Sequence, residues 1–183
     1  MLSGKEMLEL ILRRQSDRKY SDRPVEEEKL ERIIEAARMA PSACNAQPWK
    51  FVVVNDPEKL ARLAKAASAK VLGMNMFVEQ APVLIVIVRE SPNFSSKAGG
   101  LIKSKDYSHI DIGIAAENIS LQAAAEGLGS CILGWFDEKE VRSILGIPRS
   151  KRVELIISVG YSPGEYRQKK RKPKEVTVSF NKY

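Results

Sequence analysis

Apolar residues recur at helical spacing in five parts of the chain. In the first part, Ser3 and Glu6 have the spacing of a capping box, and in the second the periodic pattern stops at Pro41. Three further helices are expected to begin near Asp56, Ser108 and Asp137. The apolar residues that this spacing assigns to buried helix faces are Met7, Leu8, Ile11, Leu12, Leu30, Ile33, Ile34, Ala37, Leu60, Leu63, Ala64, Ala67, Ile110, Ile114, Leu121 and Ala125.

Shorter apolar runs predict strands between these helices. Val83–Val88 is apolar without interruption, which is typical of a strand covered on both faces. The other expected strands are Phe51–Val54, Cys131–Trp135, Val153–Val159 and the alternating segment Glu175–Phe180. The pattern predicts one domain over residues 1–183, of the α+β class, in which helices sandwich a mixed β-sheet. Glu175–Phe180 follows a polar basic loop, so it either pairs within its own subunit or joins the sheet of a partner.

Length and composition are those of an ordinary globular protein. The chain has 183 residues, of which 44% are hydrophobic and 29% charged. No apolar run approaches the roughly 20 residues that span a bilayer, and the first residues lack the pattern of a signal peptide. We expect the two cysteines, Cys44 and Cys131, to be reduced thiols, which indicates a cytoplasmic protein.

The charge of the chain is unevenly distributed. The formal net charge is +7, and one short segment holds six cations without an acid: Arg167, Lys169, Lys170, Arg171, Lys172 and Lys174. Such a segment suits nucleic-acid binding, a solvated tail or one wall of a phosphate site, and composition does not choose among them.

The sequence offers little for catalysis by side chains alone. His109 is the single histidine, so neither a histidine metal site nor a serine triad is expected. The cysteines form no CxxC pair, and no glycine-rich phosphate loop occurs. We therefore assign no catalytic residue and expect a bound cofactor to supply the chemistry.

Two polar segments are the candidates for a cofactor site. Pro41–Trp49 is rich in Pro, Ser, Asn and Gln and lies between a helix and a strand. Arg13–Tyr20 gathers guanidinium groups at the end of the first helix. A phosphorylated flavin accounts for both, because arginine and lysine hold a phosphate dianion and Ser42, Asn45 and Gln47 offer polar groups to the ring edge. The extended run Ile132–Trp135 offers an apolar face to the ring.

In this order and spacing, the segments resemble those of the FMN-dependent nitroreductase family. Arg14–Arg18 is similar to the Arg-x-Ser-x-Arg element of that family, and Ala40–Trp49 is similar to its loop that reaches FMN across the dimer interface. Asp111–Ser130 resembles its central dimer helix. The residues that the resemblance assigns to cofactor binding are Arg14, Gln15, Ser16, Arg18, Pro41, Ser42, Ala43, Asn45, Gln47, Ile132, Leu133, Gly134, Trp135, Lys169 and Arg171.

The resemblance implies a homodimer that exchanges terminal segments and binds FMN at its interface. It also implies ping-pong chemistry, in which NADH or NADPH reduces FMN and the reduced flavin passes electrons to a nitroaromatic or quinone. Gln15 departs from the residues common at its position. The candidate cover of the acceptor pocket is the 91–106 segment, which we expect to be mobile, with Met74, Asn75 and Met76.

Two other interpretations remain open at this point. The same scaffold supports reductive dehalogenation and flavin breakdown. A basic nucleic-acid-binding module is the third reading, although the 167–174 segment lacks the interleaved aromatic residues that stack on bases.

Overall fold

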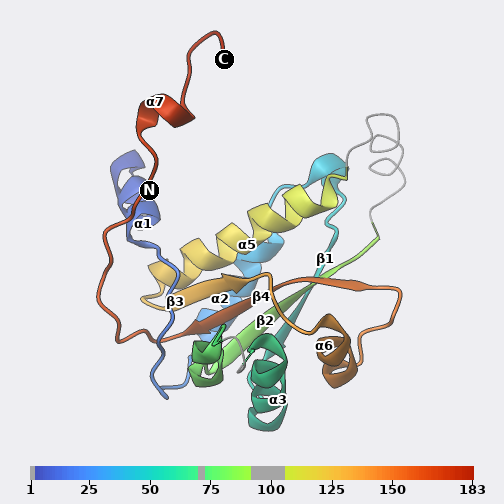
Figure 1. Ribbon diagram of the computed structural model, residues 1–183. Coiled ribbons are helices and arrows are strands. Elements are labelled where there is room, and N and C mark those ends of the chain that lie inside the picture. The colour runs from blue at the N-terminus through green and yellow to red at the C-terminus, as the bar shows by residue number, and fades with distance from the viewer. Residues whose placement is uncertain (1–2, 70–72, 92–105) are drawn as a thin grey trace.

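The computed structural model describes residues 3–69, 73–91 and 106–183. A four-stranded sheet carries helices on both faces (Figure 1). The helices are α1 (Gly4–Arg13), α2 (Glu27–Arg38), η1 (Ala43–Asn45), α3 (Pro57–Ala67), η3 (Met76–Gln80), α5 (Ser108–Ala125), α6 (Glu138–Leu145) and α7 (Lys174–Thr177). The strands are β1 (Trp49–Val54), β2 (Val83–Arg89), β3 (Gly129–Leu133) and β4 (Arg152–Gly160).

The strand order is β1-β2-β4-β3, and every neighbouring pair is antiparallel. The expected mixed sheet is therefore wrong for these four strands. Outside these strand pairings, an isolated bridge between Ser16 and Ser130 is parallel. The α+β class itself is confirmed, because helices and an antiparallel sheet form separate layers of one core.

The two faces of the sheet hold separate apolar clusters. On one face, Ile85 and Ile157 pack with residues of α2 and α5. On the other, Leu84 and Ile156 pack with residues of α3 and α6. Each residue of β2 from Val83 to Val88 is buried, as its uninterrupted apolar run predicted.

Two predicted helix faces are wrong. The apolar stripe of α1 is exposed, with Leu8 exposed by 55%, and α1 contains no buried residue. In α5, Ile110 and Ile114 are exposed, while the buried face consists of Ser108, Asp111, Ile112, Ala115, Ala116, Ile119, Ser120 and Ala123. Because α5 has apolar residues on more than one side, its spacing alone does not say which side meets the sheet.

The predicted strand Glu175–Phe180 is also wrong within this chain. Residues 174–177 form the short helix α7, closed by a bond from the backbone N–H of Val178 to the carbonyl of Lys174. The C-terminal segment projects away from the sheet (Figure 1). Residues 175–180 are all exposed, and none of the strands of the described sheet pairs with them. The predicted excursion at 91–106 lies outside the described residues except at its two ends.

Residues 14–20 are fastened to the β3–β4 side of the sheet. The backbone N–H of Asp17 donates to the carbonyl of Ser130 at 2.9 Å. The Tyr20 hydroxyl lies 2.8 Å from Ser158 Oγ and donates to the carbonyl of Asp17. Burial raises the pKa of Tyr20 above its ordinary value. At Gly129, a Cβ atom would lie 2.8 Å from the side chain of Asp17, so the close approach of this segment requires glycine.

Tyr20→Phe is expected to lower the free energy of unfolding by about 1–3 kcal/mol, because it leaves buried groups of Ser158 and Asp17 without their partner. Urea unfolding followed by circular dichroism measures the change. Tyr183→Phe makes the same chemical change at a fully exposed tyrosine and should be neutral. Equal stability of the two variants would contradict an anchoring role for the Tyr20 hydroxyl.

Candidate functional site

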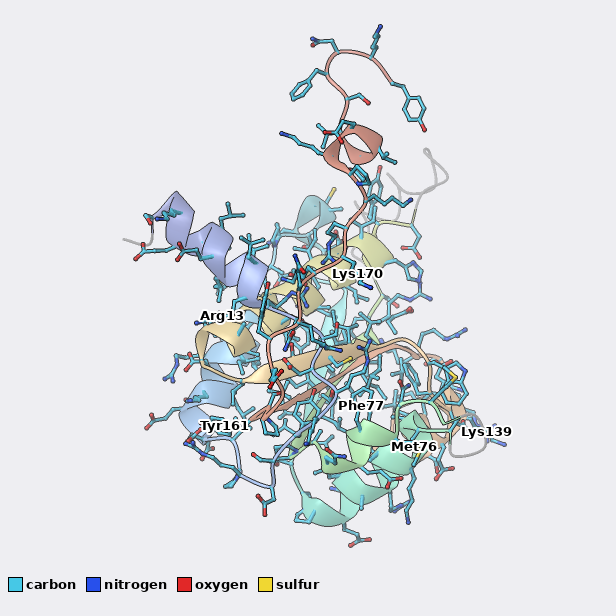
Figure 2. All side chains as sticks on the ribbon, turned by 60° about the vertical axis from the view of Figure 1, so that its left-hand side comes forward. Arg13, Met76, Phe77, Lys139, Tyr161 and Lys170 are labelled. Atoms are coloured by element: carbon cyan, nitrogen blue, oxygen red, sulfur yellow. The ribbon has the colours of Figure 1, made fainter. Side chains whose placement is uncertain are left out.

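A basic pocket of about 360 Å³ forms where the end of α1 meets the segment that follows β4. Its lining contains six cations and no acid: Arg14, Gln15, Ser16, Arg18, Arg167, Gln168, Lys169, Lys170 and Arg171. The later segment runs from Tyr161, where β4 has ended, toward Lys170 beside the end of α1 (Figure 2). The pocket therefore joins residues from opposite ends of the chain.

The side chain of Gln15 connects the segment after β4 to the segment after α1 by hydrogen bonds. Its Nε2 donates to Asp17 Oδ1 at 2.9 Å and to the carbonyl of Glu165 at 3.2 Å. Its Oε1 accepts from the backbone N–H of Arg167 at 3.0 Å. The Arg167 guanidinium in turn donates to the carbonyl of Ser16. The side-chain amide of Gln15 is thus engaged within the protein.

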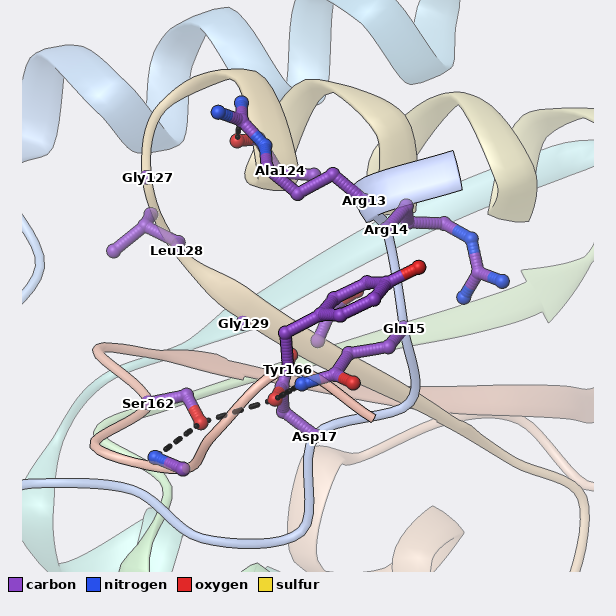
Figure 3. A pocket seen from close by; sticks show the side chains of 12 residues that line it. Arg13, Arg14, Gln15, Asp17, Ala124, Gly127, Leu128, Gly129, Ser162 and Tyr166 are labelled. Atoms are coloured by element: carbon purple, nitrogen blue, oxygen red, sulfur yellow. Dashed lines mark hydrogen bonds between the residues drawn. The ribbon is translucent and has the colours of Figure 1, made fainter. Parts of the chain in front are cut away.

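A neighbouring hollow of about 240 Å³ contains the other half of this network (Figure 3). There Asp17 Oδ1 also accepts a hydrogen bond from Ser162 Oγ at 3.0 Å. Asp17 is buried, and a buried carboxylate is stable only with such donors. Asp17 and Ser162 therefore set the position of Gln15, and through Gln15 that of the basic segment.

The charges of the basic pocket favour an anion. Burial, followed by the charges of Arg14 and Arg171, lowers the pKa of Lys169 below its ordinary value. The Lys169 ammonium donates to the carbonyls of Ile11, at 2.7 Å, and Leu12, at the end of α1. The buried Nε of Arg14 makes no hydrogen bond among the described residues and lies 3.3 Å from an oxygen of Glu117. A bound anion would offset the repulsion among these cations.

The polar loop at 41–47 lies elsewhere. It contains η1 and is held near the start of α5, where the backbone N–H of Ala43 donates to Asp111 Oδ1 at 3.2 Å. The end of α1 contacts the other end of α5, because Arg13 donates to the carbonyl of Ala124. At 1.5 Å per residue, positions 111 and 124 are about 20 Å apart along the helix. None of the predicted loop residues Pro41, Ser42, Ala43, Asn45 and Gln47 lines the basic pocket.

The end of β3 and the residues that follow it have alternating environments. Ile132 is 39% exposed, whereas the side chain of Leu133 is 4% exposed and packs in the core. In this chain, Ile132 is therefore open to a ligand and Leu133 is not. Trp135 is 44% exposed and lines a separate hollow of about 440 Å³ between α3 and α6. The carbonyl of Trp135 accepts a hydrogen bond from Asn75 Nδ2.

Of the predicted site residues, Arg14, Gln15, Ser16, Arg18, Lys169 and Arg171 come together in one pocket. Sequence reasoning placed the basic cluster at 169–171, which includes Lys170, near the phosphate, but it did not assign Arg167 or Gln168 to the site. Sequence reasoning also gave no role to Asp17 or Ser162, because their contact depends on how β3 and β4 are placed in the fold.

Other kinds of site find no support in the described parts of the chain. No group of three or more His, Cys, Asp or Glu residues there is arranged to hold a metal ion. Neither cysteine forms a disulfide, and burial raises the pKa of the Cys131 thiol. No helix within the described residues is long and apolar enough to cross a membrane. His109 lies on the surface between Asp106 and Glu154, at 3.4 Å from each.

Comparison with known proteins decides the family. The sequence profile of the nitroreductase family matches residues 11–76 and 69–161 of this chain. The chain belongs to the nitroreductase family. As a member of this family it is an oxidoreductase. Within the basic segment, residues 167–171 line the pocket described above.

Three proteins that are similar to this chain differ in their names. A protein of Archaeoglobus fulgidus, provisionally named an NADH dehydrogenase/NAD(P)H nitroreductase, is 36% identical over 164 residues, which cover 87% of each chain. The structure of an FMN-dependent nitroreductase from Clostridium difficile is 34% identical with a TM-score of 0.79, covering 96% of this chain and 99% of that one. Iodotyrosine deiodinase 1 of Rattus norvegicus is 28% identical over 87% of this chain and 63% of its own.

Inorganic phosphate is expected to stabilise the protein through the basic pocket, by about 1.4 kcal/mol at ten times its Kd. A thermal shift titration at constant ionic strength measures this. Arg18→Gln removes one cation of the pocket and should reduce the shift. The control is Arg62→Gln, because Arg62 lines the separate hollow that also contains acids. Equal shifts in both variants would show that phosphate acts elsewhere.

Proposed function

We propose that this protein is an FMN-dependent oxidoreductase that uses NADH or NADPH to reduce nitroaromatics or quinones by a ping-pong mechanism. The observation that carries the proposal is the basic pocket, in which six cations from both ends of one chain converge without an acid among the lining residues. Family membership supports it, as does the similarity to an FMN-dependent nitroreductase. Residues 1–183 would then form one FMN-binding domain.

The donors of the pocket fit the phosphate of FMN. Arginine binds a phosphate through two parallel N–H groups, and lysine adds a compact charge. Arg14 carries a buried Nε that makes no hydrogen bond to the described residues, and Arg18 is exposed beside it. Lys169 and Arg171 would approach the phosphate from the opposite wall. In this proposal Gln15 keeps the two walls together, and only its backbone faces the cofactor.

The rest of the cofactor would lie along the end of β3 and the residues that follow it. FMN, when bound, supplies the acceptor and donor of hydride, so the protein itself needs no acid or base. Ile132 is exposed in this region and offers an apolar surface. The polar side chains Ser42, Asn45 and Gln47 would hydrogen-bond to the ring edge and stabilise the charge that develops there on reduction.

We further propose a homodimer in which the 41–47 loop of one subunit completes the site of the other. In a single chain this loop contacts the first turn of α5, whereas Arg14 and Arg13 at the end of α1 contact Glu117 and Ala124 farther along that helix. A dimer would also cover exposed apolar residues, which a lone chain leaves in water. These residues are Met7, Leu8, Ile11 and Leu12 of α1, Ile110 and Ile114 of α5, and Val176, Val178 and Phe180 near the C-terminus. Exchange of the C-terminal segments between subunits remains part of this proposal.

A second activity has one specific observation in its favour. The similarity to rat iodotyrosine deiodinase 1 extends over 87% of this chain, so reductive removal of halide from an aromatic ring is the alternative reaction. The two thiols are compatible with either activity in a reducing compartment such as the cytoplasm.

An absorbance spectrum tests the proposal directly. The purified protein, supplied with FMN and freed of excess, should absorb near about 370 and 450 nm, and NADH or NADPH should bleach these bands without oxygen. Reoxidation by a nitroaromatic or a quinone supports the main proposal, whereas reoxidation by a halogenated phenol with halide release supports the alternative. A protein that retains no FMN would refute both.

Arg14→Ala or Arg18→Ala should weaken FMN binding by about tenfold or more, because each removes a charge-assisted contact worth about 1.5–3 kcal/mol. Both variants should bind riboflavin, which lacks the phosphate, as the wild type does. Flavin fluorescence titration measures both affinities. Unchanged FMN affinity in both variants would refute the phosphate assignment.

Leu8→Glu is expected to shift the protein toward monomers, because it puts a charge on the apolar face of α1. Val53→Glu makes the same change at an exposed apolar position of β1, away from that face, and should leave assembly unchanged. Analytical ultracentrifugation distinguishes the two. A wild type that is monomeric while fully loaded with FMN would contradict the shared site.

A further inference from the structure

The 42–47 loop has an unusual backbone. Three of its residues that are not glycine adopt left-handed conformations: Cys44 with φ 52°, Asn45 with φ 51° and Gln47 with φ 46°. Such conformations are disfavoured for residues with a Cβ atom and persist only where the surrounding structure holds them. Something must therefore keep this loop in place.

Part of the restraint is internal to the loop. The backbone N–H of Gln47 donates to Ser42 Oγ at 3.0 Å, and that of Asn45 donates to the carbonyl of Ser42. The side-chain amide of Gln47 donates to Asn45 Oδ1 at 3.1 Å. These bonds set the shape of the loop but do not attach it to the rest of the protein. Asn45 and Gln47 are exposed.

A side chain from another element contacts the backbone of the loop. Asp111, in the first turn of α5, accepts from the backbone N–H of Ala43 at 3.2 Å through Oδ1. Asp111 is 4% exposed, and its Oδ2 has no hydrogen-bond partner among the described residues. Burial of a carboxylate is costly for stability, and an exposed acid at this helix end would interact with the helix dipole equally well. Helix stability therefore does not explain why Asp111 is buried.

We propose that Asp111 is a positioning residue, which holds the 42–47 loop in its left-handed conformation so that Asn45 and Gln47 meet the flavin ring. This inference rests on the proposed function, in which that loop contacts the FMN bound mainly by the other subunit. Asp111 acts through the backbone of Ala43 and does not itself touch the flavin. Its effect falls on the ring end of the cofactor and not on the phosphate end.

Two variants separate the effect of the Asp111–Ala43 hydrogen bond from the effect of the Asp111 charge. Asp111→Ala removes the acceptor for Ala43, whereas Asp111→Asn keeps an oxygen acceptor without the charge. Ser120→Ala is the matched control, because Ser120 is buried on the same helix and its hydroxyl bonds only to Ala116 within that helix. Melting temperatures of the variants show whether each one folds.

The first measurement needs no flavin. Amide hydrogen exchange of residues 42–47 in the flavin-free protein should accelerate about tenfold or more in Asp111→Ala and remain near the wild-type rate in Asp111→Asn and Ser120→Ala. Unchanged exchange in Asp111→Ala would overturn the proposal. If Asp111→Ala does not fold, exchange in Asp111→Asn decides, because a rate as fast as that of an unprotected amide would show that an oxygen acceptor there does not hold the loop.

The second measurement locates the effect on the cofactor. Asp111→Ala should raise the Kd of FMN and of riboflavin by the same factor, about tenfold, while Arg18→Ala raises that of FMN alone. Asp111→Asn should restore both affinities to within about twofold. Faster exchange with unchanged flavin affinities would overturn the link between the loop and the ring. A wild type that binds neither flavin would refute the proposed function, while hydrogen exchange would still decide whether Asp111 holds the loop.

Discussion

The attachment of residues 14–20 to β3 and β4 is the constraint on which the basic pocket depends. Two contacts bring the end of α1 to the edge of the sheet where β4 ends. They are the bridge between Ser16 and Ser130 and the hydrogen bond of the buried Tyr20 hydroxyl. Once both segments are there, Gln15 and Asp17 align them through side-chain hydrogen bonds. Without this attachment, the cations of the two ends would be ordinary surface charges.

The parts of the fold that sequence predicts well are those with local causes. α6 begins after Asp137 as expected, because a side-chain cap acts within a few residues, and it ends at the left-handed Gly146. The capping box of Ser3 and Glu6 is likewise present. The stripe of α1 shows the limit of such reasoning. Its spacing is helical, but spacing does not say whether the chain itself or something outside it covers the apolar face.

The residues of the site also differ in whether the sequence alone could indicate their roles. The family resemblance assigned Arg14, Arg18, Lys169 and Arg171 to one cofactor site, and these residues do line one pocket. The role of Gln15 was not predictable, since its partners at 165 and 167 approach it only after β4 has been placed. Nor was that of Asp111, which depends on a backbone contact 68 residues away in sequence.

The exposure of α1 has a thermodynamic consequence for the pocket beside it. A helix of ten residues with no buried side chain has little intrinsic stability, yet its last carbonyls accept hydrogen bonds from Lys169 and Tyr166. Ordering of the helix and ordering of the basic segment are therefore linked equilibria. By reciprocity, any ligand that fixes the cations also stabilises the helix, and any surface that covers the helix tightens the binding of that ligand by the same factor.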